Sequence, residues 1–245
     1  MSFAAGPTVL APGATHTVGS SVSDIDLTGN IVYAIDSGSG ADRTLAGVLF
    51  EGSQAGAIAG YTQSTANVSL GWGSYDIGAT IDDDTLETML ADIQCCDTTF
   101  GSPATYAFAV PNGLFQVQLL FGEKGSANSP DHTRPFDIEI EGLTTDEINV
   151  VGLLNADGSH AHPDAGTFDF DGDGTLNDQF SIYMQNVEVT DGILNIRQGQ
   201  IVGDLVGGDR NQVLSAIIVE QVPEPASAAL FAAGAIGFLA RRRRC

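Results

Sequence analysis

Hydrophobic and polar residues alternate along most of this chain with a period of two, which is the period of a β-strand that buries one face. The clearest alternation runs through residues 105–123, TYAFAVPNGLFQVQLLFGE, and continues on both sides of a central Pro-Asn-Gly. Pro111 cannot donate to a strand ladder, and Asn112 followed by Gly113 accepts the positive φ values of a tight turn. The pattern predicts a β-hairpin whose apolar face must be covered by a second layer.

The same alternation predicts further short strands, and one segment shows helical spacing instead. Acidic residues open the segment 82–93, and apolar residues follow at intervals of three and four: Leu86, Met89, Leu90 and Ile93. A short helix and an irregular loop both fit this segment. The predicted strands cover residues 31–36, 46–51, 135–142, 148–154, 180–189, 193–196 and 213–220. About ten short strands favour an all-β fold, a two-sheet antiparallel β-sandwich of the jelly-roll type.

The composition fits one large β-rich domain and limits its partners. The chain has 245 residues, of which 43% are hydrophobic and 30 are glycines, and its formal net charge is −22. Such an acidic body repels nucleic acid and anionic membranes, so we expect no nucleic-acid partner. We divide the chain into a polar N-terminal segment at residues 1–30, a β-sandwich at 31–221 and a C-terminal segment at 222–245.

Five stretches of the chain follow one another in an order that is typical of a known family. IVYAIDSGSG comes first, followed by YAFAVPNGLFQVQLLFGE, RPFDIEIEG, VTDGILNIR and GGDRNQVLSAIIVE. Together they resemble the malectin-like carbohydrate-binding domains over roughly residues 31–220. The resemblance implies a β-sandwich that binds glucose-type glycans through loop aromatics and an acidic residue. The matching positions here are Tyr106, Phe108 and Asp209.

These residue types suit a neutral glycan. Aromatic faces pack on the apolar face of a pyranose ring, and a carboxylate accepts hydrogen bonds from sugar hydroxyls. Asp209 lies in a Gly-rich segment before a predicted core strand, where the binding loops of a sandwich are expected. Tyr106 and Phe108 share one strand face, and if that face points to the core they fill the sandwich instead.

The C-terminal segment combines three features of a sorting signal. Pro223, Glu224 and Pro225 precede an apolar run at residues 226–240, and four arginines follow it: Arg241, Arg242, Arg243 and Arg244. This arrangement resembles the PEP-CTERM signal of Gram-negative bacteria, which a membrane exosortase recognises and removes. An apolar helix of this length spans about 22 Å, short of the roughly 30 Å hydrocarbon core, and the arginines would hold the cytoplasmic side.

We therefore expect an exported protein that sits in the inner membrane before processing and at the cell surface or in the extracellular matrix afterwards. A permanent membrane anchor is the alternative. Either outcome requires a leader peptide, yet residues 1–30 show no basic region followed by an apolar run. We expect the true start of the protein to lie upstream of Met1, and export by another route is the alternative.

A further motif is the acidic loop DFDGDGTLND at residues 169–178. It reproduces most of an EF-hand-type calcium loop, with side-chain oxygens at positions 1, 3, 5 and 9, Gly at position 6 and a backbone carbonyl at position 7. Position 12 is Phe180, so Asp178 or a residue from elsewhere would complete the shell. The predicted Ca²⁺ ligands are Asp169, Asp171, Asp173, Thr175, Asn177 and Asp178; an acidic turn without metal is the alternative. We interpret His160 and His162 as loop residues.

These features predict a non-catalytic, exported protein that binds a glycan or exopolysaccharide and is processed by an exosortase. One alternative is a structural or adhesive calcium-binding matrix protein without a sugar site. A less favoured alternative is a glycoside hydrolase that uses Glu139 and Glu141 as a carboxylate pair, although the solvated face of an acidic strand is the simpler explanation. Cys95 and Cys96 are adjacent, so we interpret them as packing or lone thiols.

Overall fold

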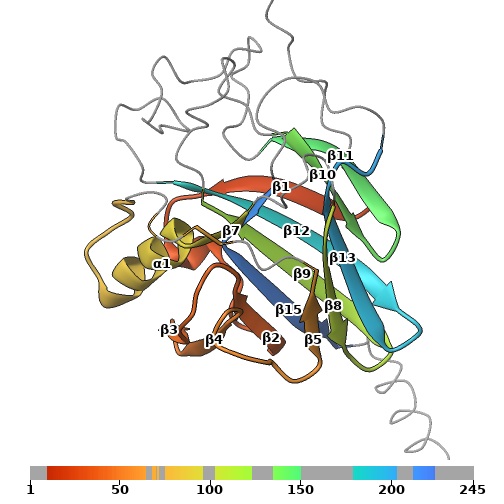
Figure 1. The fold of residues 1–245 in the computed structure, drawn as a ribbon, viewed down its shortest axis with the longest axis horizontal. Helices are drawn as coiled ribbons and strands as arrows, with labels where there is room; N and C mark the ends of the chain where they lie inside the picture. The colour runs from red at the N-terminus through yellow and green to blue at the C-terminus, as the bar shows by residue number, and fades with distance from the viewer. Residues whose placement is uncertain are drawn as a thin grey trace, which may run out of the picture.

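The structure, a computed structural model, describes residues 10–64, 68, 69, 71, 75–95, 103–122, 135–149, 179–202 and 212–223. These residues form two large β-sheets, a small third sheet, one α-helix and one short 3-10 helix (Figure 1). The two large sheets are layered as a sandwich, which confirms the predicted all-β fold.

Backbone hydrogen bonds order the strands within each sheet. The seven-stranded sheet runs β1 (Ala14–Gly19), β12 (Phe180–Val189), β9 (Gly113–Phe121), β15 (Ala216–Val222), β2 (Asn30–Asp36), β4 (Val48–Gly52) and β3 (Arg43–Leu45). The five-stranded sheet runs β11 (Leu143–Asn149), β10 (Pro135–Ile140), β13 (Ile193–Gly199), β8 (Ala104–Ala109) and β5 (Tyr61–Gln63). The small sheet runs β14 (Val213–Leu214), β7 (Ile93–Cys95) and β6 (Val68–Ser69). All these pairs are antiparallel except β2 with β4, which is parallel.

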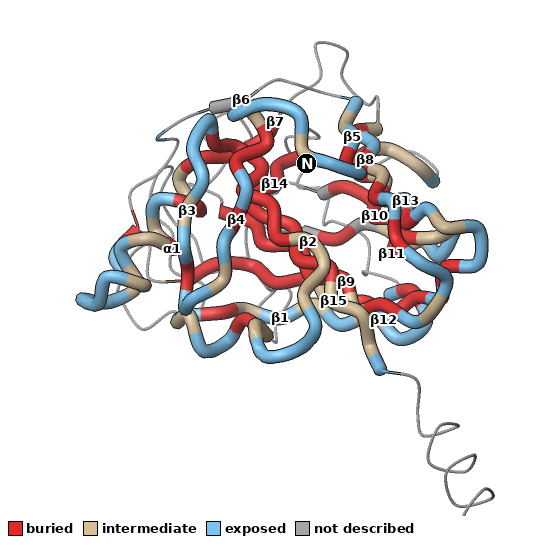
Figure 2. Tube along the Cα trace, turned by 90° about the horizontal axis from the view of Figure 1, so that it is seen from below, coloured by how far each residue is buried: buried red, intermediate tan, exposed pale blue. Residues whose placement is uncertain are grey.

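The main hydrophobic core lies between the two large sheets, and Figure 2 shows the buried strands running through the centre of the molecule. Alternate residues of each strand enter this core, as the period-two pattern predicts. The fully buried side chains include Phe115, Val117, Leu119, Phe121, Phe136, Ile138 and Ile140. Burying one such side chain stabilises a fold by about 1.5–3 kcal/mol, so this core is the main source of stability.

A second core covers the outer face of the seven-stranded sheet. The helix α1 (Ile81–Ala91) packs here with Leu86, Met89 and Leu90 buried, beside the 3-10 helix η1 (Val22–Asp24). Thr80 caps α1: its hydroxyl accepts the Asp83 N–H at 3.2 Å, and the acidic first turn complements the positive end of the helix dipole. The helical interpretation of residues 82–93 is confirmed as far as Ala91, and Ile93 belongs to β7.

The predicted hairpin at residues 105–123 is wrong. β8 and β9 form the two predicted strands, but β8 pairs with β13 and β5, while β9 pairs with β12 and β15 in the other sheet. The chain crosses from one layer to the other at Pro111 and Asn112, and Val110 N–H donates to Gly192 O at 3.0 Å. Both strands bury their apolar faces in the same core, from opposite sides. Their residues therefore alternate as the two strands of a hairpin would, although the strands do not pair with each other.

Three other predicted boundaries differ from the structure. The apolar run 213–220 is two strands, β14 and β15, which part at Ser215 and enter different sheets. Residues 14–19, which lie in the predicted polar N-terminal segment, form β1 at the edge of the larger sheet. β11 begins earlier than predicted, at Leu143, and residues 150–154 lie outside the described ranges.

The predicted C-terminal apolar helix at residues 226–240 also lies outside the described ranges. Among the residues that the structure describes, no helix is both long and apolar enough to cross a membrane.

Candidate functional site

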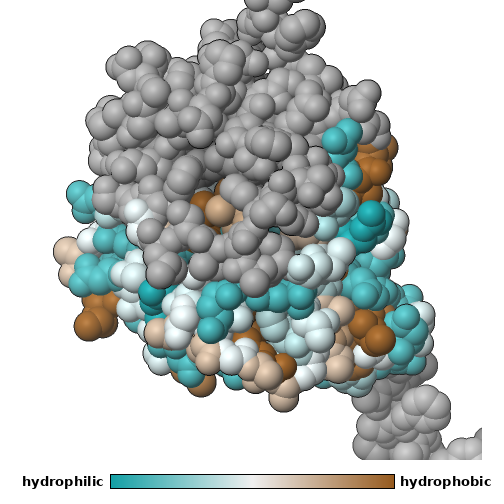
Figure 3. Space-filling view, viewed as in Figure 1, coloured by the Kyte–Doolittle hydropathy of each residue, from teal (hydrophilic) through white to brown (hydrophobic). Residues whose placement is uncertain are grey.

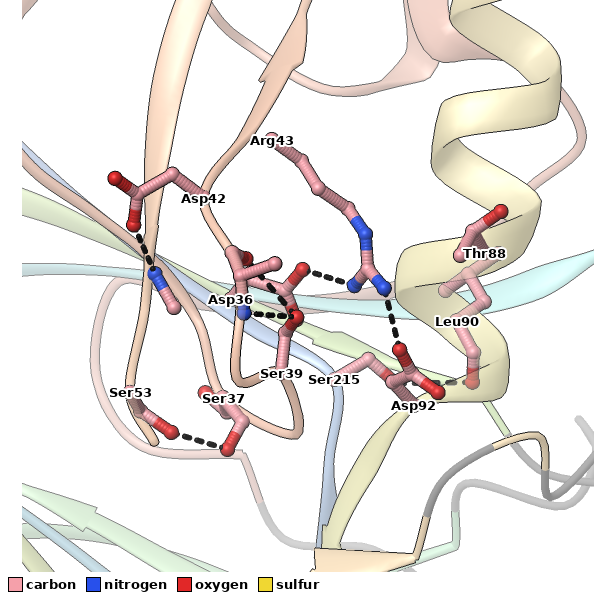
Figure 4. Close-up of polar contacts among 12 residues, drawn as sticks. Asp36, Ser37, Ser39, Asp42, Arg43, Ser53, Thr88, Leu90, Asp92 and Ser215 are labelled. Carbon is pink, nitrogen blue, oxygen red and sulfur yellow. Dashed lines mark hydrogen bonds and ion pairs between the residues drawn. The ribbon is translucent and has the colours of Figure 1, made fainter. Parts of the chain in front are cut away.

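An ion-pair cluster lies at the end of the sandwich where β2 ends and β15 begins (Figure 4). The Arg43 guanidinium pairs with the Asp36 carboxylate and, at 2.6 Å from Nη2 to Oδ2, with the Asp92 carboxylate. Asp92 also accepts the Gly71 N–H at 3.0 Å. Because these residues come from β2, β3 and the end of α1, the cluster fixes three elements relative to one another.

The turn after β2 brings this cluster together. Gly38 passes so close to the backbone of Asp92 and Ile93 that an added Cβ would lie 2.3 Å from the Asp92 carbonyl carbon. A larger residue at this position would push the turn away from β7. The Ser39 hydroxyl donates to Ala41 O at 2.9 Å, and the Ser53 hydroxyl donates to Ser37 O at 2.5 Å, so side chains as well as backbone hold the turn.

The cluster has two carboxylates for one guanidinium, and this imbalance matters because Asp36 is fully buried. Burial raises the pKa of Asp36 from 3.8 to about 7, although the Arg43 charge and hydrogen bond oppose the rise. Within the described residues, Asp36 Oδ1 has no hydrogen-bond partner. Asp36 exposes no surface to a ligand, so its role is to hold the loops at this end.

A surface groove of about 420 Å³ lies between β2 and β4. The two strands pair only at Ile35 with Glu51 and at Asp36 with Gly52, so the remainder of each facing edge lines the groove. Backbone N–H and C=O groups on such an edge are available to a hydrogen-bonding ligand. Three side chains in the groove add recognition chemistry: Tyr33, Glu51 and Asn30.

Tyr33 is held in one orientation by contacts with the other sheet. Its hydroxyl donates to Ala109 O at 2.9 Å and lies 3.3 Å from Ala59 O, and its ring centroid lies 5.1 Å from that of Phe108. Gly60 has a φ of +76° and leaves room for this hydroxyl, because an added Cβ there would lie 2.3 Å from it. Tyr33 therefore presents a fixed, partly exposed ring to the groove.

Burial and the negative charge of Glu51 both raise the pKa of Tyr33, so its hydroxyl stays protonated and keeps donating to Ala109 O. Glu51 itself is exposed. An aromatic side chain, a carboxylate and the Asn30 amide thus line one groove.

Tyr106 and Phe108, predicted to contact sugar, lie inside the main core. Tyr106 is 2% exposed and Phe108 is not exposed at all, so neither ring can contact a ligand in this structure. The alternative left open by the sequence, that their strand face points inward, is the arrangement observed. The sequence does not reveal Tyr33 as a site residue, because in IVYAID it alternates like any core residue. It lies beside a groove because β2 and β4 pair only at the end of β2.

Glu139 and Glu141 each have a structural partner. Glu139 Oε1 pairs with Arg197 Nη1 at 2.8 Å, and its other oxygen accepts the Thr144 hydroxyl at 3.2 Å. Glu141 occupies the turn after β10 with φ +50°, and its carboxylate accepts the Asn195 N–H at 2.6 Å. These bonds explain both residues as parts of the β10–β13 pairing.

Several predicted site residues lie outside the described ranges: Asp169, Asp171, Asp173, Thr175, Asn177, Asp178, Asp209, Glu224, Pro225 and the four arginines at 241–244, together with His160, His162 and Cys96. Pro223 is described and is exposed directly after β15. Cys95 is not in a disulfide. The described part of the chain contains no group of three or more His, Cys, Asp or Glu residues that could hold a metal ion.

Comparison with known proteins identifies the C-terminal segment and supports the fold. Residues 221–244 match the model of the PEP-CTERM protein-sorting motif, which confirms that prediction. A search of curated protein sequences gave no match.

The solved structures that are similar to this chain include the plant receptor-like kinase ANX2. Its TM-score is 0.51 and its identity is 10%, and the match covers 79% of this chain and 48% of that one. A calcium-binding mutant of Bacteroides uniformis β-glucuronidase 2 has a TM-score of 0.49 and 16% identity, over 81% of this chain and 19% of that one. The chain thus spans about half of the first protein and a fifth of the second.

These findings support the β-sandwich fold, which the chain shares with the solved plant receptor-like kinase, and the sorting motif gives the route of the protein. The PEP-CTERM motif marks a protein that is exported, anchored transiently in the membrane, cleaved by an exosortase and then associated with the surface.

Proposed function

We propose that this is a non-catalytic carbohydrate-binding protein of the cell surface or extracellular matrix. The observation that carries the proposal is the groove between β2 and β4, where the fixed Tyr33 ring, the Glu51 carboxylate and the Asn30 amide lie together. The malectin-like fold and the sorting motif support the same conclusion, because they fit an exported binding domain.

The chemistry of the groove suits a neutral, hydroxyl-rich ligand. The Tyr33 ring offers a flat apolar surface to the C–H face of a pyranose, while Glu51 accepts hydroxyl donors in charge-assisted bonds. Unpaired backbone groups of β2 and β4 can both donate and accept, as sugar hydroxyls do. A polyanionic ligand is disfavoured by the net charge of −22.

Asp209 remains a proposed second contact. It lies outside the described residues, in the connection between β13 and β14, and the resemblance to malectin-like domains is its support. The loop at residues 169–178 is proposed to bind Ca²⁺ through Asp169, Asp171, Asp173, Thr175, Asn177 and Asp178, on the strength of its ligand spacing.

A glycan array followed by calorimetry with neutral gluco-oligosaccharides tests the proposal. Glu51→Gln should weaken binding about tenfold, which corresponds to the roughly 1.5 kcal/mol of a hydrogen bond to a charged group. Glu188→Gln, another exposed strand carboxylate that lies away from the groove, is the matched control and should bind like wild type. Asp209→Ala tests the second contact separately.

Three outcomes separate the function classes. Retention of unmodified sugar with loss in Glu51→Gln supports the lectin function at the groove. Absence of binding to any glycan in the array supports a structural or adhesive protein instead. Release of a shortened product would assign a glycoside hydrolase and refute the non-catalytic proposal.

A further inference from the structure

The C-terminal segment at residues 222–245, called the tail below, leaves the sandwich at the end opposite the Asp36–Arg43–Asp92 cluster. β15 starts at Ala216, which pairs with Asp36, and it ends near Asn30, which pairs with Gln221. On its other side Val222 pairs with Leu114 at the start of β9. Figure 1 shows this end at the bottom of the view, where β8, β9 and β15 meet.

The sorting motif begins inside the folded domain. Its match starts at residue 221, while β15 continues to Val222, so the first part of the motif is a paired strand. Only Pro223, Glu224 and Pro225 separate the strand from the apolar run. Three residues span at most about 11 Å, so anchoring the apolar run holds this end of the sandwich within roughly that distance of the bilayer.

Exposed apolar side chains occur at this same end. Each stands beside a turn at the start of a strand: Leu114 of β9 is 36% exposed, Leu143 of β11 is 38% exposed and Ile193 of β13 is 45% exposed. The register places each of them at this end of its own sheet, because Leu143 pairs with Ile140, Ile140 pairs with Ile196 of β13, and Ile193 pairs with Ala109 before the β8–β9 crossing. In Figure 3 apolar residues stand among polar ones along the lower edge of the molecule.

We infer that the anchored precursor rests on the membrane surface by this end, with Leu114, Leu143 and Ile193 in the headgroup region. A single exposed leucine on a protein surface needs no explanation. Three apolar side chains at the end that the C-terminal segment holds near the bilayer are a different case. The tether keeps their effective concentration at the membrane high, so they can enter the apolar boundary of the bilayer without a separate binding step.

The charges at this end determine which lipid fits. Glu141 and Asp191 lie in the turns beside Leu143 and Ile193. Carboxylates at the contact disfavour anionic headgroups, so the surface suits zwitterionic lipid. Docking therefore weakens as the fraction of anionic lipid rises.

The test uses the full chain reconstituted in phosphatidylcholine–phosphatidylethanolamine vesicles that contain a headgroup-region quencher. A fluorophore is attached through an unnatural amino acid at position 193, so that the native cysteines stay in place. The matched control carries it at Val202, which is 46% exposed and follows β13 at the opposite end. We expect at least threefold stronger quenching at position 193 than at 202. Equal quenching at both positions would refute the inference.

A second variant tests the side chains themselves. With the fluorophore at the exposed Thr190, replacing Leu114, Leu143 and Ile193 by Asn should lower quenching below that of the unsubstituted protein, while the tail keeps the protein in the vesicles. Unchanged quenching would show that the tail alone sets the distance. Quenching or protection that appears only after exosortase is added would assign this end to a protein contact and overturn the membrane docking.

Discussion

The buried carboxyl of Asp36 should make the stability of this protein fall as pH rises from about 4 to about 7, and the fall should level off above that pH. Its pKa is 3.8 in the unfolded chain and about 7 in the folded protein. Between these values the folded state binds a proton that the unfolded state has released, so the free energy of unfolding decreases with increasing pH. Near pH 4 the folded protein holds Asp36 protonated, and burying the neutral group costs little free energy. Above pH 7 Asp36 is charged, and burying this charge lowers the free energy of unfolding.

The size of the effect follows from the two pKa values. Each tenfold difference in proton affinity is worth about 1.36 kcal/mol, so the interval from 3.8 to about 7 corresponds to about 4 kcal/mol. Asp36→Asn removes this term and leaves Arg43 paired with Asp92 alone, one charge against one. The variant should exceed the stability of wild type by about 1 kcal/mol at pH 4.5 and by up to about 4 kcal/mol at pH 8.

Urea unfolding at half-unit steps from pH 4.5 to 8 measures this difference. Other carboxylates titrate in both proteins, so subtraction of the two curves isolates Asp36. Arg43→Gln supplies a second check: loss of the guanidinium raises the pKa of Asp36 further, so the fall in stability becomes larger and continues to higher pH. Parallel curves for wild type and Asp36→Asn across the whole range would refute the reasoning.

Three other outcomes are expected. Millimolar Ca²⁺ added after chelation should raise the melting temperature, because an ion that binds only the folded loop stabilises by about 2.7 kcal/mol at a hundred times its Kd, and Asp171→Asn should abolish the shift. In a host with the matching exosortase, the mature protein should lack Arg241 to Arg244, as mass spectrometry can show. An intact C-terminal peptide in membranes would indicate a permanent anchor. Phe108→Ala should cost about 3–5 kcal/mol in unfolding free energy, and a cost below 1 kcal/mol would argue against the core position.

Alternation in the sequence was sufficient to predict which faces are buried. Phe136, Ile138 and Ile140 all point to the core as the pattern requires. Alternation carries no information about the partner of a strand, and for this reason it predicts a hairpin where the chain crosses from β8 to β9. The same limit hid the break at Ser215, since an unbroken apolar run fits a strand in either sheet.

The candidate site depended on contacts between distant parts of the chain. Arg43 and Asp92 are 49 residues apart, and nothing local to either residue indicates the other. Tyr33 follows core alternation, so its exposure depends on where β4 stops pairing. The sorting motif is different, because it is one continuous segment, residues 221–244, that can be identified from the sequence alone.

The position of β15 also determines how the protein carries mechanical load. β15 lies between β9 and β2 and is antiparallel to both, and the tail continues directly from its C-terminal end. A pull on the tail acts along the strand, at right angles to its hydrogen bonds, so many bonds on both sides resist together. An edge strand such as β1 has one ladder to resist with. A protein held by the segment that follows β15 is thus held through a strand that is paired on both sides, and shear forces from flow or from a bound polymer act on two ladders at once.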